Sequence, residues 1–295
     1  MKNLESSKIN VAEIITKTIN SLFENLFSSI DNNIYNILDD ITFIDSDILK
    51  DTYFSSIFGT SSQNGILLIA NSLIIGIVIY YLFRLLYSHY LSIEIEKPTQ
   101  FFFKLIIFTI LINSSFFICD QLITINSYIS LAIREIGESI FNENISFSQL
   151  VIKLNSVISI SDSSFNAFSL DGIIKSFISI ELLNLLFVHS LRYILIKVFV
   201  LITPFAILTL INHSTSWFFK SWIKSIISLL LIQSLISLIL VITFSIKSDA
   251  SSIFTKLMYI GSLFAITKSN LYIKELIGGI STNISGSIID LKNKR

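Results

Sequence analysis

The stretch SIISLLLIQSLISLILVITFSI, residues 225–246, decides the fold class of this chain. It carries no charged side chain, and as a helix it is long enough to cross a bilayer core, which requires about 20 residues. Its apolar residues form a continuous run and do not alternate strictly with polar ones, as they would in a strand of a membrane barrel. The stretch therefore predicts a transmembrane helix.

The composition of the whole chain supports the same interpretation. Of the 295 residues, 52% are hydrophobic and 14% are charged, and the mean hydropathy is +0.74. About 25% of the residues in an ordinary soluble domain are charged, so a soluble protein of this composition could not cover its surface with polar groups. Prolines and glycines are few, which favours helices. The sequence predicts an all-α, polytopic transmembrane bundle and excludes a cytosolic enzyme.

Three further apolar segments each predict one membrane crossing. Residues 66–83 form the first span, and residues 101–122 form the second, which can continue as one helix toward Ile133. A weaker span covers residues 253–267.

The segment 176–211 is harder to interpret, because it is too long for one perpendicular span and too short for two spans with a turn. We expect one tilted crossing that bends near Pro204. The alternative is a helical hairpin that breaks near Arg192. The first interpretation gives the chain five spans, and the second gives six.

Polar segments separate and flank these spans. An N-terminal amphipathic helix is followed by an acidic connection, a Ser/Asn-rich loop follows the second span, and the C-terminal tail is amphipathic and then basic. We therefore divide the chain into five regions, residues 1–60, 61–133, 134–175, 176–270 and 271–295.

The distribution of Lys and Arg predicts the orientation, because cytoplasmic loops are enriched in these residues. Arg84, Lys97 and Lys104 place the loop after the first span in the cytoplasm, and the basic tail does the same for the C-terminus. The 134–175 loop is acidic and is predicted to be external. With five spans, the N-terminal region is external as well.

Ionisable and amide groups inside a membrane are costly, so they are candidate functional residues. Asn113 and Asp120 fall on one predicted helical face, which is either an interhelical polar seam or a hydrophilic path. Lys197 is expected either to extend to the interface or to pair with Asp120 or Glu181. The candidate intramembrane groups are Asn113, Asp120, Glu181, Arg192 and Lys197.

The sequence has no recognisable enzyme motif. It lacks a phosphate loop, a zinc-binding His-Glu-x-x-His, a nucleophile elbow and spaced metal ligands. The single Cys119 lies in an apolar run and is interpreted as a small packing residue. We expect no catalytic activity, no metal and no cofactor.

Two runs near the middle of the chain resemble the TrbL family, whose members are polytopic inner-membrane proteins of type IV secretion and conjugal transfer systems. They are KVFVLITPF, residues 197–205, and TSWFFKSW, residues 215–222. The family has a proline–hydrophobic pair ending one span, a short connection with a Thr and paired Trp, and then a long uncharged span. Residues 265–279 are similar to the family's C-terminal portion.

The resemblance implies a non-enzymatic part of a translocation channel or its platform in the bacterial inner membrane. Its partners would be other type IV secretion subunits, including transfer ATPases, and the bilayer. The cargo in transit would be single-stranded DNA bound to a relaxase, or a protein, and no small-molecule substrate is expected. The main alternative is a small-solute secondary transporter or permease, but the chain shows no internal repeat of the kind that many transporters have.

The connection before the uncharged span is a candidate docking site for a transfer ATPase. It combines aromatic side chains with cations, as binding hot spots often do, although tryptophans also simply anchor span boundaries. Its residues are Trp217, Lys220, Trp222 and Lys224.

Overall fold

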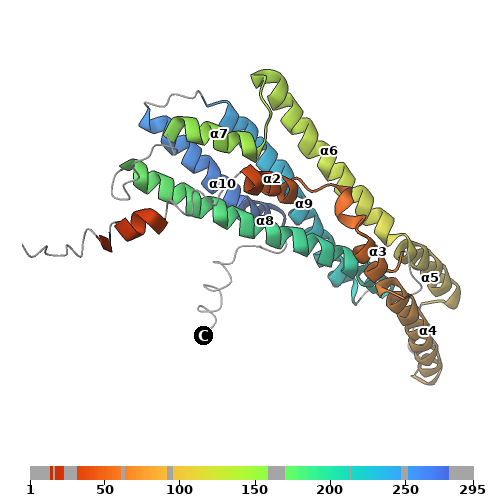
Figure 1. Ribbon diagram of the computed structural model, residues 1–295. Coiled ribbons are helices and arrows are strands. Elements are labelled where there is room, and N and C mark those ends of the chain that lie inside the picture. The colour runs from red at the N-terminus through yellow and green to blue at the C-terminus, as the bar shows by residue number, and fades with distance from the viewer. Residues whose placement is uncertain are drawn as a thin grey trace, which may run out of the picture. The chain divides into compact units, whose positions relative to one another are not determined.

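The computed structural model describes residues 14–15, 17–22, 32–60, 64–91, 96–158, 170–212, 214–246 and 252–278. Within these ranges every regular element is a helix (Figure 1). Among the described residues, four helices are long and apolar enough to cross a membrane, which confirms the all-α membrane class predicted from composition. They are α4 (Ile66–Leu91), α6 (Ser115–Phe141), α8 (Leu170–Leu208) and α9 (Ser216–Phe244).

The helices belong to two compact units that do not follow the order of the sequence. The first unit combines Met1–Ile41, Ile133–His189 and Leu238–Lys268. The second unit combines Thr42–Ala132, Ser190–Ser237 and Ser269–Arg295. Long helices such as α8 contribute to both units. The consecutive regions predicted from the sequence therefore do not coincide with the units.

In the first unit, α2 (Asn32–Thr42) caps the start of α7 (Phe147–Ile158). The Asp39 carboxylate accepts hydrogen bonds from the Phe147 N–H at 2.8 Å and the Ser148 N–H at 3.3 Å, and so satisfies two donors that have no partner within the helix. Burial raises the pKa of Asp39, and the two N–H donors oppose that shift.

Helix α7 lies in the region predicted as a polar loop, and that conformation was predicted wrongly. The Ser and Asn content concealed a helical apolar stripe, since Phe147, Leu150 and Leu154 recur at helical spacing and are fully buried.

Helices α4 and α5 (Pro98–Asn113) form a hairpin in the second unit and run side by side (Figure 1). Pro98 stands at the first position of α5, where its missing N–H has no helical partner to lose. Near the end where the two helices are connected, the Tyr81 ring stacks on Phe101 with centroids 3.8 Å apart. Further along, the Asn71 amide donates to Asn113 Oδ1 at 3.1 Å.

The second predicted span, residues 101–122, is not one helix, because α5 ends at Asn113 and α6 begins at Ser115. Polar side chains at the break hydrogen-bond to the preceding turn: Asn113 donates to the Thr109 carbonyl and Ser115 to the Ile112 carbonyl. Such bonds give the backbone an alternative to a continuous helix. Asn113 and Asp120 therefore lie on different helices, which corrects the predicted common face.

Helix α8 passes through both Arg192 and Pro204 without interruption. The hairpin alternative, with a break near Arg192, is therefore wrong as a description of this helix. Pro204 lies near its end, before the short 3-10 helix η2 (Thr209–Ile211). A proline there removes one helical hydrogen bond close to the point where the helix stops.

Helix α9 begins at Ser216, earlier than the predicted start at residue 225. Trp217 and Trp222 therefore belong to its first turns and not to a connection. Helix α10 (Ile253–Ile277) is long, but it is not among the four described helices that are apolar enough to cross a membrane. The five-span count stays a prediction.

The two ends of the chain are described only in part. Residues 14–15 and 17–22 are helical, and Ile15 and Leu22 are exposed there. The rest of the predicted amphipathic helix before Asn32, and the tail beyond Gly278, lie outside the described residues.

Candidate functional site

Arg192, in the part of α8 that belongs to the second unit, is 1% exposed. Its guanidinium donates from Nε to the Leu229 carbonyl at 2.8 Å, from Nη1 to the Thr42 carbonyl at 2.9 Å, and from Nη2 to Gln233 Oε1 at 3.3 Å. All three acceptors are neutral. Among the described residues, no carboxylate forms an ion pair with this arginine.

Gln233 extends this arrangement, because its Oε1 also accepts the Ile44 N–H at 3.1 Å. The guanidinium therefore joins α8 and α9 to the last residue of α2, and Gln233 joins them to the segment that follows. A buried charge is tolerated only when its donors are satisfied, and the planar fork of an arginine can satisfy several acceptors at once. We call Arg192, Gln233, Thr42, Ile44 and Leu229 the arginine cluster.

A second set of buried polar contacts connects α6 to α9. The Ser234 hydroxyl donates to Asn126 Oδ1 at 3.3 Å, and the Ser130 and Ser237 hydroxyls lie 2.6 Å apart. Small hydroxyl residues let helix backbones approach closely and form bonds that lipid cannot offer. These four residues, the α6–α9 seam, are an interhelical seam of the kind expected from the sequence, at different positions.

The end of α8 and the start of α9 are joined at one carbonyl. Trp222 is 4% exposed, and its indole Nε1 donates to the Phe199 carbonyl at 3.0 Å. The Thr203 hydroxyl donates to the same oxygen at 2.9 Å and lies 3.1 Å from the buried Cys119 sulfur of α6. We call Phe199, Thr203, Pro204 and Trp222 the Pro–Trp joint.

This geometry corrects the predicted docking site. Because Trp222 is buried and its N–H is already bonded, it is not available to a partner. Trp217 is 66% exposed, and Lys220 and Lys224 are exposed as well. They follow one another at helical spacing, so Trp217, Lys220 and Lys224 share one face of α9.

Lys197 pairs with neither of the acids proposed for it. Its Nζ lies 3.6 Å from Asp51 Oδ2 and over the rings of Phe54 and Tyr193, 5.4 and 5.3 Å from their centroids. Asp51 also caps α3 (Thr52–Phe58) by accepting the Tyr53 N–H. Lys197 therefore holds the start of α3 against α8.

Glu181, the other proposed partner of Lys197, belongs to the first unit and is buried. Among the described residues its Oε1 has no hydrogen-bond partner.

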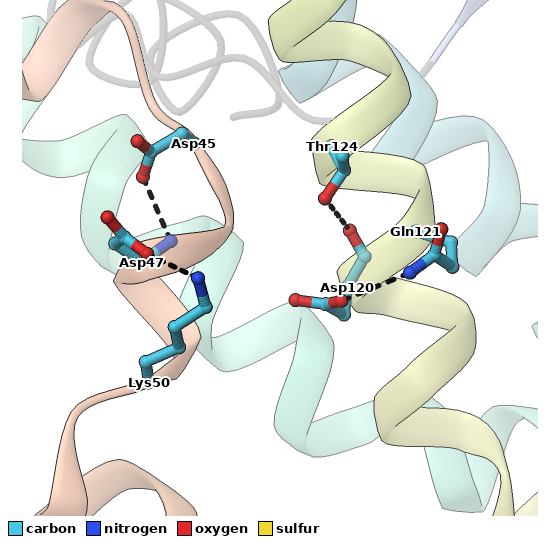
Figure 2. A network of polar contacts seen from close by, with 6 residues as sticks. All are labelled: Asp45, Asp47, Lys50, Asp120, Gln121 and Thr124. Carbon is cyan, nitrogen blue, oxygen red and sulfur yellow. Dashed lines mark hydrogen bonds and ion pairs between the residues drawn. The ribbon is translucent and has the colours of Figure 1, made fainter.

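Asp120 lies on α6 in a polar surrounding near the 3-10 helix η1 (Ser46–Leu49), as Figure 2 shows. Its carboxylate accepts from the Gln121 amide at 3.2 Å. Across from it, Lys50 pairs with Asp47, and that hydrogen bond raises the pKa of Lys50, with a smaller contribution from Asp120. Asp120 therefore lies near other charged groups and is not an isolated acid.

Sequence reasoning identified Arg192 but missed the groups that satisfy it. Two of its acceptors are backbone carbonyls, which leave no trace in a sequence. The third had a usable signal, because Gln233 is the only amide side chain in the uncharged run 225–246.

Within the described part of the chain, no group of three or more His, Cys, Asp or Glu residues could hold a metal ion. No protein-family model, no curated protein and no solved structure matches this chain. The functional argument therefore depends on the arginine cluster, the α6–α9 seam and the Pro–Trp joint.

Proposed function

We propose that the chain is a non-enzymatic subunit of a type IV secretion machine, forming part of its inner-membrane channel or platform for conjugal DNA transfer. One observation carries the proposal. The two runs that resemble the TrbL family, residues 197–205 and 215–222, meet at the Phe199 carbonyl of the Pro–Trp joint, which accepts from both Thr203 and Trp222. Residues that share a structural element form a more meaningful resemblance than scattered matches in an apolar sequence.

The use of the buried polar groups supports a scaffolding role. The strongest donor in the interior, Arg192, is bonded through Nε, Nη1 and Nη2 to groups of this chain. Hydroxyl pairs such as Ser130 and Ser237 bond to each other across helices. Groups engaged in this way join helices to one another, and this arrangement suits a static membrane platform better than a solute carrier.

The exposed face of Trp217, Lys220 and Lys224 supports a contact with a cytoplasmic transfer ATPase. An aromatic side chain beside two cations is suited to an acidic partner surface. The proposed orientation places this face in the cytoplasm, the N-terminus outside and the C-terminus inside. Other secretion subunits would cover further surfaces, and relaxase-bound single-stranded DNA would pass through the assembled machine.

The decisive experiment is conjugal transfer from a cell that carries the element. Deletion of the chain should abolish transfer, and the wild-type gene should restore it. The triple variant Trp217→Ala, Lys220→Ala, Lys224→Ala should reach the membrane at normal level but lose transfer and crosslinking to the transfer ATPase. Tyr53→Ala, at a side chain that is 82% exposed, is the matched control and should transfer normally.

Transfer at the wild-type level after deletion would refute the channel role. A defect in solute uptake with intact transfer would favour a permease instead. Normal transfer by the triple variant would refute only the proposed docking surface and would not contradict the platform role.

The orientation can be tested separately with an impermeant thiol reagent in intact cells, in a Cys119→Ser background. Glu143 and Lys220 are both exposed and lie on opposite sides of the membrane in the proposed topology. Glu143→Cys should be labelled and Lys220→Cys should not. The reverse pattern, or labelling of both, contradicts the topology.

A further inference from the structure

A cavity of about 440 Å³ lies in the second unit, between the end of α4, the start of α5 and η2. One part of its wall is apolar and includes Ile77, Leu208 and Ile211, and another part is charged and includes Arg84, Glu96 and Lys104. The volume falls within the usual range of small-ligand sites, roughly 300–1,000 Å³. The two kinds of wall suit a ligand with one apolar and one ionic end.

The cavity wall is held by contacts within the α4–α5 hairpin. The Tyr81 ring is buried and stacks on Phe101, and its hydroxyl donates to the Glu96 carbonyl at 2.8 Å. The Lys104 ammonium forms an ion pair with the Glu96 carboxylate. These contacts fix Glu96 against α4 and Lys104, so this ion pair has a defined position in the wall.

The charges leave an excess of one cation in the cavity wall. Lys104 is paired with Glu96, whereas Arg84 is exposed and forms no ion pair among the described residues. A guanidinium without a carboxylate partner is well suited to bind a phosphate oxygen pair.

The position of Arg84 in the sequence relates the cavity to the bilayer. It is the first charged residue after the apolar run 66–83, so α4 leaves the hydrocarbon core at this point. Tyr80, Tyr87 and Tyr90 are exposed around it, 59%, 67% and 88%. Tyrosines gather at the level of lipid headgroups, which places the charged wall at headgroup depth and the apolar wall beside the acyl chains.

We propose that this cavity binds an anionic phospholipid, with its phosphodiester on Arg84 and the start of an acyl chain along Ile77, Leu208 and Ile211. A free phosphate ion would share the contact with Arg84 but would leave the apolar wall uncovered. A zwitterionic lipid would gain less from the excess cation. The proposal depends on the chain residing in a membrane and is independent of the secretion role.

The test uses the full chain in nanodiscs of phosphatidylcholine containing increasing fractions of phosphatidylglycerol, with bound lipid counted by native mass spectrometry. The wild type should retain phosphatidylglycerol in preference to phosphatidylcholine. One Lys or Arg near a membrane surface changes anionic-lipid affinity by roughly fivefold, so Arg84→Gln should weaken retention by about that factor. Lys50→Gln removes the same charge from an exposed position outside the cavity, where Lys50 is already paired with Asp47, and should leave retention at the wild-type level.

Glu96→Gln makes the test independent of misfolding. It removes the only carboxylate of the described cavity wall and frees Lys104, so phosphatidylglycerol should bind roughly fivefold more tightly. A variant that merely damaged the fold would bind less.

Three results would overturn the proposal. One is equal retention of phosphatidylcholine and phosphatidylglycerol by the wild type. Another is unchanged retention of phosphatidylglycerol by Arg84→Gln. The third is displacement of the lipid by millimolar inorganic phosphate, which would identify a free-anion site.

Discussion

Helices α4 and α9 are both strongly apolar, yet 11% of the most apolar stretch of α4 is buried against 61% of that of α9. The two helices differ in the kind of side chain that they bury or expose. Helix α9 buries a series of serines and one glutamine, whereas α4 exposes large aliphatic side chains such as Leu68, Ile75 and Ile79. Apolar content therefore identifies a membrane helix, while buried hydroxyl and amide groups identify which helix is in the interior. The buried polar residues of α9 include Ser225, Ser228, Gln233, Ser234 and Ser237.

The strongest test of this contrast is Arg192→Met, which removes the charge that joins α9 to α8. The Thr42 and Leu229 carbonyls and Gln233 Oε1 would lose their shared donor in a buried place. A buried neutral acceptor that is left without its donor costs about 1–3 kcal/mol, and three acceptors lose a donor here, so the cost should be about 3 kcal/mol or more. We expect the free energy of unfolding, measured by denaturing detergent titration, to fall by about this amount.

Lys224→Met is the matched control, since it makes a similar change at an exposed position of α9. Surface substitutions of this kind usually stay within about 0.5 kcal/mol. If Arg192→Met destabilises no more than Lys224→Met, the arginine cluster does not hold the helices together.

The burial contrast can be measured directly with one substitution on each helix. Ile236 of α9 is 0% exposed and Ile75 of α4 is 64% exposed. Truncation of a buried Ile to Ala leaves a cavity and costs about 2–5 kcal/mol, so Ile236→Ala should lower the free energy of unfolding by at least about 2 kcal/mol. Ile75→Ala should change it by less than about 0.5 kcal/mol. Equal effects would mean that α4 is covered in the same way as α9.

The two tryptophans at the start of α9 also differ in burial, since Trp222 is buried and Trp217 is exposed. Trp222→Phe removes the indole N–H from the Phe199 carbonyl and leaves a small void, which should cost about 1–3 kcal/mol. Trp217→Phe keeps an exposed ring and should have little effect. The stabilities of the two variants can be compared by thermal unfolding in detergent. If Trp222→Phe destabilises the protein no more than Trp217→Phe does, Trp222 is a surface residue after all.

The smallest expected effect concerns the α6–α9 seam. A double-mutant cycle with Ser130→Ala and Ser237→Ala should give a coupling energy of about 0.6 kcal/mol, the average for interhelical hydrogen bonds in a membrane protein. The matched cycle on the hairpin joins Asn71→Ala with Asn113→Ala, a pair that is more exposed. A coupling in the hairpin larger than that in the seam would reverse the proposed ranking of the two regions.

The sequence predicted what depends on local composition. The helical membrane class and the long apolar runs around residues 66–83 and 225–246 follow from hydropathy and the absence of charge, and the described helices contain them. The break at Ser114 was missed because Asn113, Ser114 and Ser115 stand inside an apolar context, where three polar residues do not interrupt the hydropathy pattern. The side-chain bonds of Asn113 and Ser115 to the preceding turn favour the break.

The candidate site was predictable only in its charged members. Arg192 and Lys197 stood out because charges inside apolar runs are rare. Their partners could not be predicted, since Thr42 and Asp51 are distant in sequence and come close only when α8 packs. Trp222 was assigned to the surface because a tryptophan beside lysines resembles an interfacial residue, and only its packing on Phe199 distinguishes the two.

The fully buried guanidinium also sets an order of events during synthesis. Gln233 follows Arg192 by 41 residues, so at roughly 5–20 residues per second the ribosome produces Arg192 about 2–8 seconds before its side-chain acceptor exists. During that interval the Arg192 guanidinium lacks two of its three acceptors, the Leu229 carbonyl and Gln233 Oε1. We therefore expect a chain that ends between α8 and α9 to hold α8 in the membrane less stably than a chain that includes Leu229 and Gln233.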